Sequence, residues 1–127
     1  MIQGIAQNLL DDATVALLVG TKVFPVVAPQ GVKKPYITAR IISNDPNSNK
    51  DAISTLDTVH FQIVSYAEKY TQVDAIDNAV RACTDNASGE VEGIKFDRIY
   101  FETHEDLFDQ EDQAYIRNSK YRAMIRR

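Results

Sequence analysis

Few side chains in this sequence could do chemistry: two histidines, one cysteine and a run of carboxylates. A zinc site needs three or four convergent ligands, and neither His60 nor His104 has a cysteine or a second histidine at ligand spacing. Cys83, the single cysteine, excludes an internal disulfide and falls beside Val80 and Ala87 on the apolar stripe of a predicted helix. A reactive thiol needs an electropositive, partly exposed setting, so we expect a buried, inert one. These residues predict surface or interface histidines, no metal site and no cofactor.

The densest group of carboxylates lies near the C-terminus and comprises Glu102, Glu105, Asp106, Asp109, Glu111 and Asp112. A calcium-binding loop would need oxygen ligands at alternate positions and a glycine at the bend, whereas this run is irregular and contains no glycine. Two glycosidase carboxylates could in principle come from it, but nothing in the sequence positions a sugar. We expect an acidic turn over residues 105–112 that is either solvated or a docking surface. The chain also lacks a glycine-rich phosphate loop and a nucleophile elbow, so we expect that it is not an enzyme.

The last strand is of opposite charge, because it carries Arg117, Lys120 and Arg122. The outward face of the predicted sheet also interleaves tyrosines with basic residues, namely Tyr36 and Tyr100 with Arg40, Arg98, Lys120 and Arg122. A solvated strand face is one interpretation. The other is an interface, since tyrosine and arginine are enriched at interfaces. A chain with both an acidic and a basic patch can contact its own copy head to tail, and such contacts can close into rings.

Length and composition indicate one globular domain over residues 1–127. The sequence is 44% hydrophobic and carries a net charge of −4, so it has no basic field to gather nucleic acid. Its longest apolar run, Val15 to Val19, is far shorter than the roughly 20 residues that cross a bilayer. No secretory signal is visible at the N-terminus. We expect a soluble protein that folds in a reducing cytosol, with no membrane partner and no specific nucleic acid partner.

The elements follow from hydrophobic periodicity. Apolar residues recur at helical spacing from Ile2 to Leu17 and predict a helix that breaks near Asp12. Alternation then predicts strands around 37–41 and 59–66, joined by a polar loop over 44–54, and a helix follows from Thr71 toward Gly89. A short apolar strand begins at Val23, before these elements, and two more strands lie around 99–101 and 121–125. The predicted fold is α+β: an antiparallel sheet of about four main strands with two helices on one face, in the order α-β-β-β-α-β-β.

The same periodicity predicts the core. The residues expected to be buried between helices and sheet are Ile5, Leu9, Leu17, Ile37, Ile41, Phe61, Ile63, Ile76, Val80, Phe101 and Ile125.

The order of short motifs resembles the phage tail completion family, the tail-to-head joining or tail terminator proteins of long-tailed phages and prophages. The matching motifs are Leu17-Leu18-Val19-Gly20, Val23-Phe24-Pro25, Ala28-Pro29-Gln30-Gly31-Val32, Pro35-Tyr36-Ile37, Val59-His60-Phe61-Gln62-Ile63, the helix from Tyr70 to Ala87, and Leu107-Phe108-Asp109 with the final strand through Tyr121. The resemblance covers nearly the whole chain. Each motif is short, and their order and spacing carry the match.

The resemblance implies a structural protein with no catalytic residues to carry over. Family members form a ring, typically a hexamer, on the head-proximal end of the tail tube. The ring stops polymerisation and offers a surface to the head. The implied partners are further copies of the chain, the major tail tube protein and the head-tail connector protein. The implied location is the tail-head junction of the virion, after assembly in the bacterial cytoplasm.

Together, charge and resemblance give a set of candidate contact residues. The candidates are Arg40, Asp45, Lys50, Asp51, Arg98, Glu105, Asp106, Asp109, Glu111, Asp112, Arg117, Lys120 and Arg122. Asp45, Lys50 and Asp51 belong to the predicted 44–54 loop, which we expect to be mobile and to contact the tube or connector. Two alternatives stay open. One is another connector component, a stopper or adaptor. The other is a small α+β enzyme or ligand-binding domain that uses His60, His104 and the carboxylates.

Overall fold

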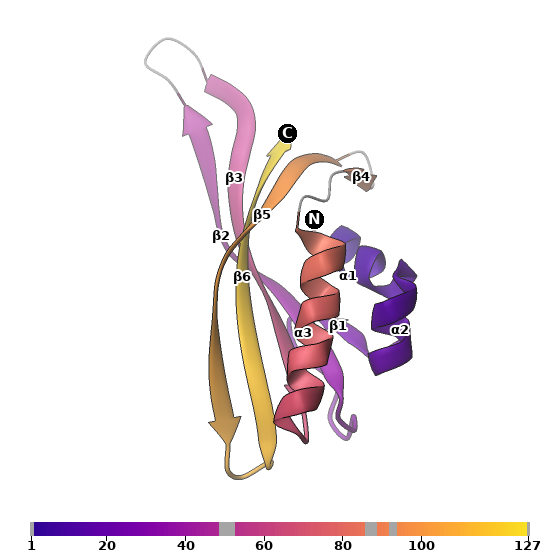
Figure 1. The fold of residues 1–127 in the computed structure, drawn as a ribbon. Coiled ribbons are helices and arrows are strands. Elements are labelled where there is room, and N and C mark those ends of the chain that lie inside the picture. Colours follow the sequence, from indigo (N-terminus) through magenta and orange to yellow (C-terminus); the bar gives the residue numbers. More distant parts are fainter. Residues whose placement is uncertain (1, 49–52, 86–88, 92–93, 127) are drawn as a thin grey trace.

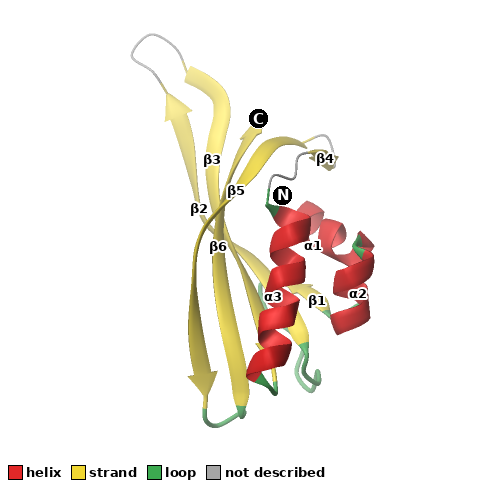
Figure 2. Ribbon diagram, in the orientation of Figure 1, coloured by secondary structure: helices red, strands yellow, loops and turns green. Residues whose placement is uncertain are grey.

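A computed structural model of the chain describes residues 2–48, 53–85, 89–91 and 94–126. In these residues three helices lie on one side of a six-stranded sheet (Figures 1 and 2). The elements are α1 (Ile2–Asp11), α2 (Ala13–Val19), β1 (Val23–Pro25), β2 (Tyr36–Ser48), β3 (Ile53–Ala67), α3 (Tyr70–Thr84), β4 (Gly89–Val91), β5 (Ile94–Asp109) and β6 (Ala114–Arg126). The predicted α+β class and the placement of helices on one face are therefore confirmed.

The sheet has the order β1-β2-β3-β6-β5-β4. Its four long strands are antiparallel, as the sequence predicts, and form two hairpins that meet along β3 and β6. The short strand that begins at Val23 was predicted, but its parallel pairing was not, and β4 was not predicted at all. β1 pairs in parallel with residues 37–39 at the start of β2, and β4 pairs with residues 94–96 at the start of β5. The sheet is therefore mixed rather than purely antiparallel.

The predicted helix break at Asp12 is confirmed, which makes three helices rather than two. The Asp12 carboxylate accepts hydrogen bonds from the backbone N–H groups of Thr14 and Val15, both at 3.0 Å, and so caps α2. Gly20 ends α2 with a positive φ of 66°, a conformation that glycine adopts without a steric penalty.

The core lies between the helices and the inward face of β3 and β6. Phe61 is fully buried and stacks on Tyr121 with ring centres 5.5 Å apart. Of the predicted core residues, Ile5, Leu9, Ile37, Phe61, Ile63, Ile76 and Val80 are buried, and Phe101 is partly buried against the same cluster. The Ile125 side chain lies outside the described residues. Most of the predicted inward face is confirmed.

Two core predictions are wrong. Leu17 is 87% exposed. A separate helix, α2, begins after the cap at Asp12, and the face that it packs against the core carries Val15 and Val19 instead of Leu17. Ile41 is 41% exposed although it pairs opposite Phe61. The parallel partner β1 ends at the level of residue 39, so Ile41 lies at an edge of the sheet that no described strand extends.

Three predicted boundaries also change. The expected loop over 44–54 is much shorter, since β2 continues to Ser48 and β3 already begins at Ile53. Asp45 therefore lies in a strand, while Lys50 and Asp51 lie outside the described residues. α3 begins after Lys69 rather than Thr71 and ends at Thr84. Finally, β5 extends to Asp109, so the acidic turn contains only residues 110–113.

Candidate interaction surfaces

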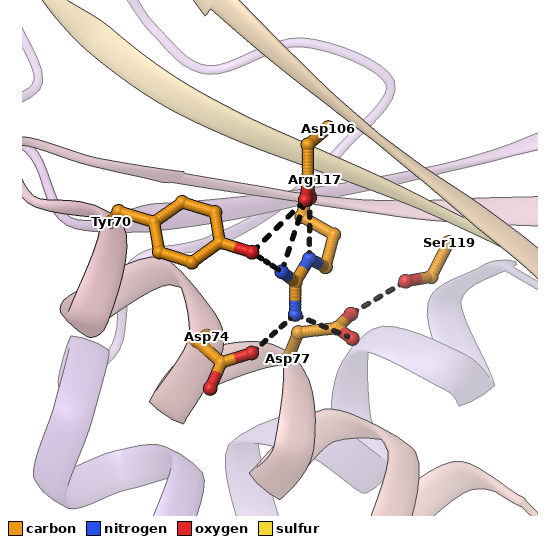
Figure 3. Close-up of polar contacts among 6 residues, drawn as sticks. All are labelled: Tyr70, Asp74, Asp77, Asp106, Arg117 and Ser119. Carbon is orange, nitrogen blue, oxygen red and sulfur yellow. Dashed lines mark hydrogen bonds and ion pairs between the residues drawn. The ribbon is translucent and has the colours of Figure 1, made fainter.

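A buried arginine joins α3 to the β5–β6 hairpin on the helix-covered face (Figure 3). The Arg117 side chain donates from Nε to Asp106 Oδ1 at 2.6 Å and from Nη2 to Asp106 Oδ2 at 3.2 Å, a two-point contact. Its Nη1 donates to Asp74 Oδ1 at 2.6 Å. Two more partners, Asp77 and Tyr70, come from α3. We call Tyr70, Asp74, Asp77, Asp106, Arg117 and Ser119 the arginine cluster.

Several polar groups of the cluster make more than one contact. The Tyr70 hydroxyl accepts from Arg117 Nη2 at 2.9 Å and donates to Asp106 Oδ2 at 3.2 Å. Asp77 lies 3.7 Å from Arg117 Nη1 and accepts a hydrogen bond from the Ser119 hydroxyl. Hydrogen bonding by Arg117 holds the pKa of Asp106 below its usual range, and Asp106 in turn raises the pKa of Arg117. The ion pair between Asp106 and Arg117 therefore stays charged at neutral pH.

This geometry removes Arg117 from the candidate interface. Arg117 is 4% exposed and its partners are within the same chain, so the pairing of Asp106 with Arg117 is internal to one molecule. Sequence reasoning missed Tyr70, Asp74, Asp77 and Ser119. One signal was available: Arg117 shares the strand alternation of Ser119 and Tyr121, which places a charged side chain on the buried face. A buried charge needs partners.

The opposite face of the sheet is not covered by any helix or strand of the described residues (Figure 1). Two guanidinium groups flank Tyr100 there: Arg98 lies 5.0 Å and Arg122 5.1 Å from the ring centre. Beside these residues, His60 Nδ1 on β3 lies 3.1 Å from Glu102 Oε1 on β5. The predicted alternation of tyrosine and arginine is thus present, and Arg98, Tyr100 and Arg122 form what we call the arginine–tyrosine patch.

A second aromatic group lies where β2 starts and β3 ends. Tyr36 stacks on Tyr66 with ring centres 4.5 Å apart, and Phe24 meets the edge of Tyr36 at 6.5 Å. The pKa of Tyr36 is raised, first by burial and then by the nearby Tyr66, Asp112 and Asp109. The negative field of the acidic turn therefore reaches this end of the sheet.

The β5–β6 turn is shaped by its own side chains. Asp109 Oδ1 accepts from the backbone N–H groups of Glu111 at 3.0 Å and Asp112 at 3.4 Å. Lys34 Nζ lies 3.3 Å from Asp112 Oδ2 and donates to the Asp112 carbonyl at 2.9 Å. Beside the turn, Leu107 is 50% and Phe108 46% exposed. The end of this hairpin therefore combines carboxylates with uncovered apolar surface.

A hollow of about 370 Å³ opens at the same end of the molecule, lined by Lys34, Glu68, Phe108, Asp112, Gln113 and Tyr115. We call it the hairpin hollow. Its aromatic side is formed by Phe108 and Tyr115, whose ring centres are 4.8 Å apart. Tyr70 of the arginine cluster meets Tyr115 edge-on at 6.0 Å, so the packing of the hollow is continuous with the cluster.

The residues that could do chemistry do not come together in one site. His60 pairs with Glu102, whereas His104 is exposed and forms a T-shaped contact with the Phe101 ring. Cys83 is half-buried rather than fully buried, and burial raises its thiol pKa to about 11, which agrees with an inert thiol. Among the described residues no group of three or more His, Cys, Asp or Glu side chains could hold a metal ion. None of their helices is long and apolar enough to cross a bilayer.

The family model for tail completion protein gp17 matches residues 3–126. The chain belongs to this family. The resemblance inferred from the short motifs is confirmed, and the chain is a structural protein of the phage tail that takes part in virion assembly. The comparison with curated proteins gives no match.

Among solved structures, the fold matches a chain from the virion of a native gene transfer agent particle. The TM-score is 0.80 at 19% sequence identity, and the match covers 99% of this chain and 98% of that chain. The arrangement of helices and strands is therefore shared along the whole length, although few residues are.

Proposed function

We propose that this tail completion protein closes into a ring, a hexamer by analogy with its family, on the head-proximal end of the tail tube. The ring ends tube polymerisation and presents a surface to the head-tail connector. The protein acts at the tail-head junction, after assembly in the bacterial cytoplasm. Its partners are its own copies, the major tail tube protein and the connector protein.

The uncovered sheet face is the observation that carries this proposal. A small single-layer sheet with one face open leaves tyrosine and arginine side chains at the surface, and these residue types dominate interface energetics. The hairpin end adds exposed Leu107 and Phe108 beside an acidic turn. Two unlike surfaces on one chain favour a heterologous contact, which generates closed rings when the rotation allows.

Charge pairing orients the subunits in this proposal. The acidic members are Glu105, Asp109, Glu111 and Asp112, and the basic members are Arg40, Arg98, Lys120 and Arg122. Rim pairs contribute only about 0–1 kcal/mol each, so the charges set orientation and association rate while apolar and aromatic contacts supply most of the affinity. The free protein can then be a monomer that closes only on the tube end, where the template raises its effective concentration.

Electron microscopy of the purified protein mixed with tail tubes tests the proposal. We expect density on one end of each tube and no further growth when tube protein is added. A phage lacking the gene should make overlong tails without heads. If tubes stay uncapped and the protein instead binds the connector, the alternative of a stopper or adaptor is favoured. Binding to neither would contradict both.

A further inference from the structure

The hairpin hollow has the chemistry of a site for a positively charged side chain. Phe108 and Tyr115 present two aromatic rings, whose faces attract cations. Its charged lining residues are Lys34, Glu68 and Asp112. Lys34 and Asp112 form an ion pair and their charges offset each other, so the negative charge of Glu68 remains. Glu68 is exposed and makes no hydrogen bond or ion pair with the described residues. The hollow is therefore net negative, and its aromatic side and its carboxylate can act on one ligand.

A guanidinium group fits this combination better than an ammonium group. Its flat face stacks on aromatic rings while its edge donates two parallel hydrogen bonds to a carboxylate. Among the described residues four guanidinium groups already lie over aromatic rings: Arg81 over Phe101, Arg98 and Arg122 over Tyr100, and Arg117 over Tyr70. The arginine cluster next to the hollow shows the complete pattern, because Arg117 contacts both the ring of Tyr70 and the carboxylate of Asp106.

We propose that the hairpin hollow receives Arg122 from a second copy of this chain. Arg122 is exposed on the uncovered face, where Tyr100 holds its guanidinium at 5.1 Å. Arg98 is less suited, since it makes a further interaction within its own chain. The charges are complementary, because an acidic, aromatic hollow meets a basic patch. The inference rests on the proposed ring, for which it supplies the contact between neighbouring subunits.

Distance within the chain excludes self-occupancy. Tyr100 pairs with Arg122, and Asp109 pairs with Ala114 beside the hollow, so nine residues of β5 separate the two levels. At about 3.3 Å per residue this is roughly 30 Å, several times the length of an arginine side chain. A molecule cannot fill its own hollow with its own patch. Both surfaces remain available at once, which a head-to-tail contact requires.

A charge swap tests the contact. Glu68→Arg and Arg122→Glu should each weaken self-association by about tenfold or more, and the double variant should recover to within about threefold of wild type because each interface regains a pair. Asp11→Arg is the matched control: it makes the same charge change at an exposed position of α1 that lies outside the hollow and outside the proposed charge pairs. We expect it to weaken association by about threefold or less. Circular dichroism melting confirms that each variant is folded.

Two readouts keep this inference separate from the proposed function. Sedimentation of the protein alone, over a concentration series that reaches about 1 mM, measures the contact between two copies without any tube or closed ring. Microscopy of tube ends measures capping. No recovery in the double variant, or equal losses for Asp11→Arg and Glu68→Arg, would overturn the hollow as the site even if wild type caps tubes. Recovery in sedimentation would support the hollow even if no tube end is capped, and in that case the proposed function alone fails.

Discussion

The two faces of the sheet use the same residue types for different purposes. On the helix-covered face, Arg117 is 4% exposed and is held by carboxylates and a tyrosine of its own chain. On the uncovered face, Arg122 is exposed and lies over Tyr100. The first arrangement fixes α3 against the hairpin, and the second leaves donors for another molecule. Arginine and tyrosine in a strand therefore indicate an interface only if they lie on the face that the helices leave uncovered.

The largest expected effect comes from the covered face. Phe61→Ala removes a fully buried ring that stacks on Tyr121, and it should cost about 3–5 kcal/mol of unfolding free energy because a cavity is left in the core. Denaturant unfolding followed by circular dichroism measures the loss. Phe108→Ala, at a ring that is 46% exposed, is the matched control and should cost much less. An unchanged midpoint for Phe61→Ala would mean that the strand faces are assigned wrongly.

The arginine cluster should come next. Arg117→Met leaves Asp74, Asp77 and Asp106 close together without their shared cation, at a cost of about 2–3 kcal/mol. The partial exposure of Asp74 and Asp106 keeps the figure below that of a fully buried pair. Arg117→Lys keeps the charge but loses the two-point contact with Asp106, so it should recover only part of the loss. Equal stability of the methionine variant and wild type, measured in urea, would contradict a structural role for the cluster.

Local patterns in the sequence account for much of this fold. Alternation in β3 and β6 places Phe61 and Ile63 correctly on the inward face, and the aspartate that interrupts the first helical stripe is the cap of α2. The errors arise where long-range contacts override local preference. Residues 44–48 are rich in turn-forming types, yet they pair with β3 because the partner strand supplies the ladder.

The candidate surface was predictable only in part. The arginine–tyrosine patch follows from alternation, because residues two apart on a strand share a face. The arginine cluster does not, since Asp74 and Asp77 come from a helix whose rotation against the sheet is set by packing. The hairpin hollow is less predictable still: Lys34, Glu68 and Tyr115 come from three separate parts of the chain and meet only in the folded molecule.

A smaller expected effect is the pH dependence of stability that the ion pair between Asp106 and Arg117 produces. Arg117 lowers the pKa of Asp106, so the stabilisation is present at neutral pH and is lost as pH falls from about 4, the ordinary aspartate value, through the lowered pKa. Asp106→Asn should therefore be less stable than wild type by about 1 kcal/mol at pH 7, with the difference shrinking at pH 3. Urea unfolding at both pH values measures it. If the difference in unfolding free energy does not shrink at pH 3, the charge of Asp106 in its ion pair with Arg117 contributes nothing to stability.

Asp11→Asn provides the control for that comparison. Asp11 is exposed and accepts a hydrogen bond from the Gln7 amide, which carries no charge. Its substitution should change stability by less than about 0.5 kcal/mol at either pH, as is usual for exposed positions.

The smallest effect on stability, and the sharpest contrast between the faces, belongs to Arg122→Ala. The side chain is exposed, so its loss should change unfolding free energy by less than about 0.5 kcal/mol. Capping of tail tubes and self-association should nevertheless fall, because a central arginine that packs on tyrosine is the type of contact that dominates an interface. Lys33→Ala, an exposed cation on the β1–β2 connector, is the matched control and should leave both readouts near wild type. If Arg122→Ala destabilised the fold as much as Arg117→Met, the uncovered face would be a second structural face, and the division of the molecule into scaffold and contact surface would fail.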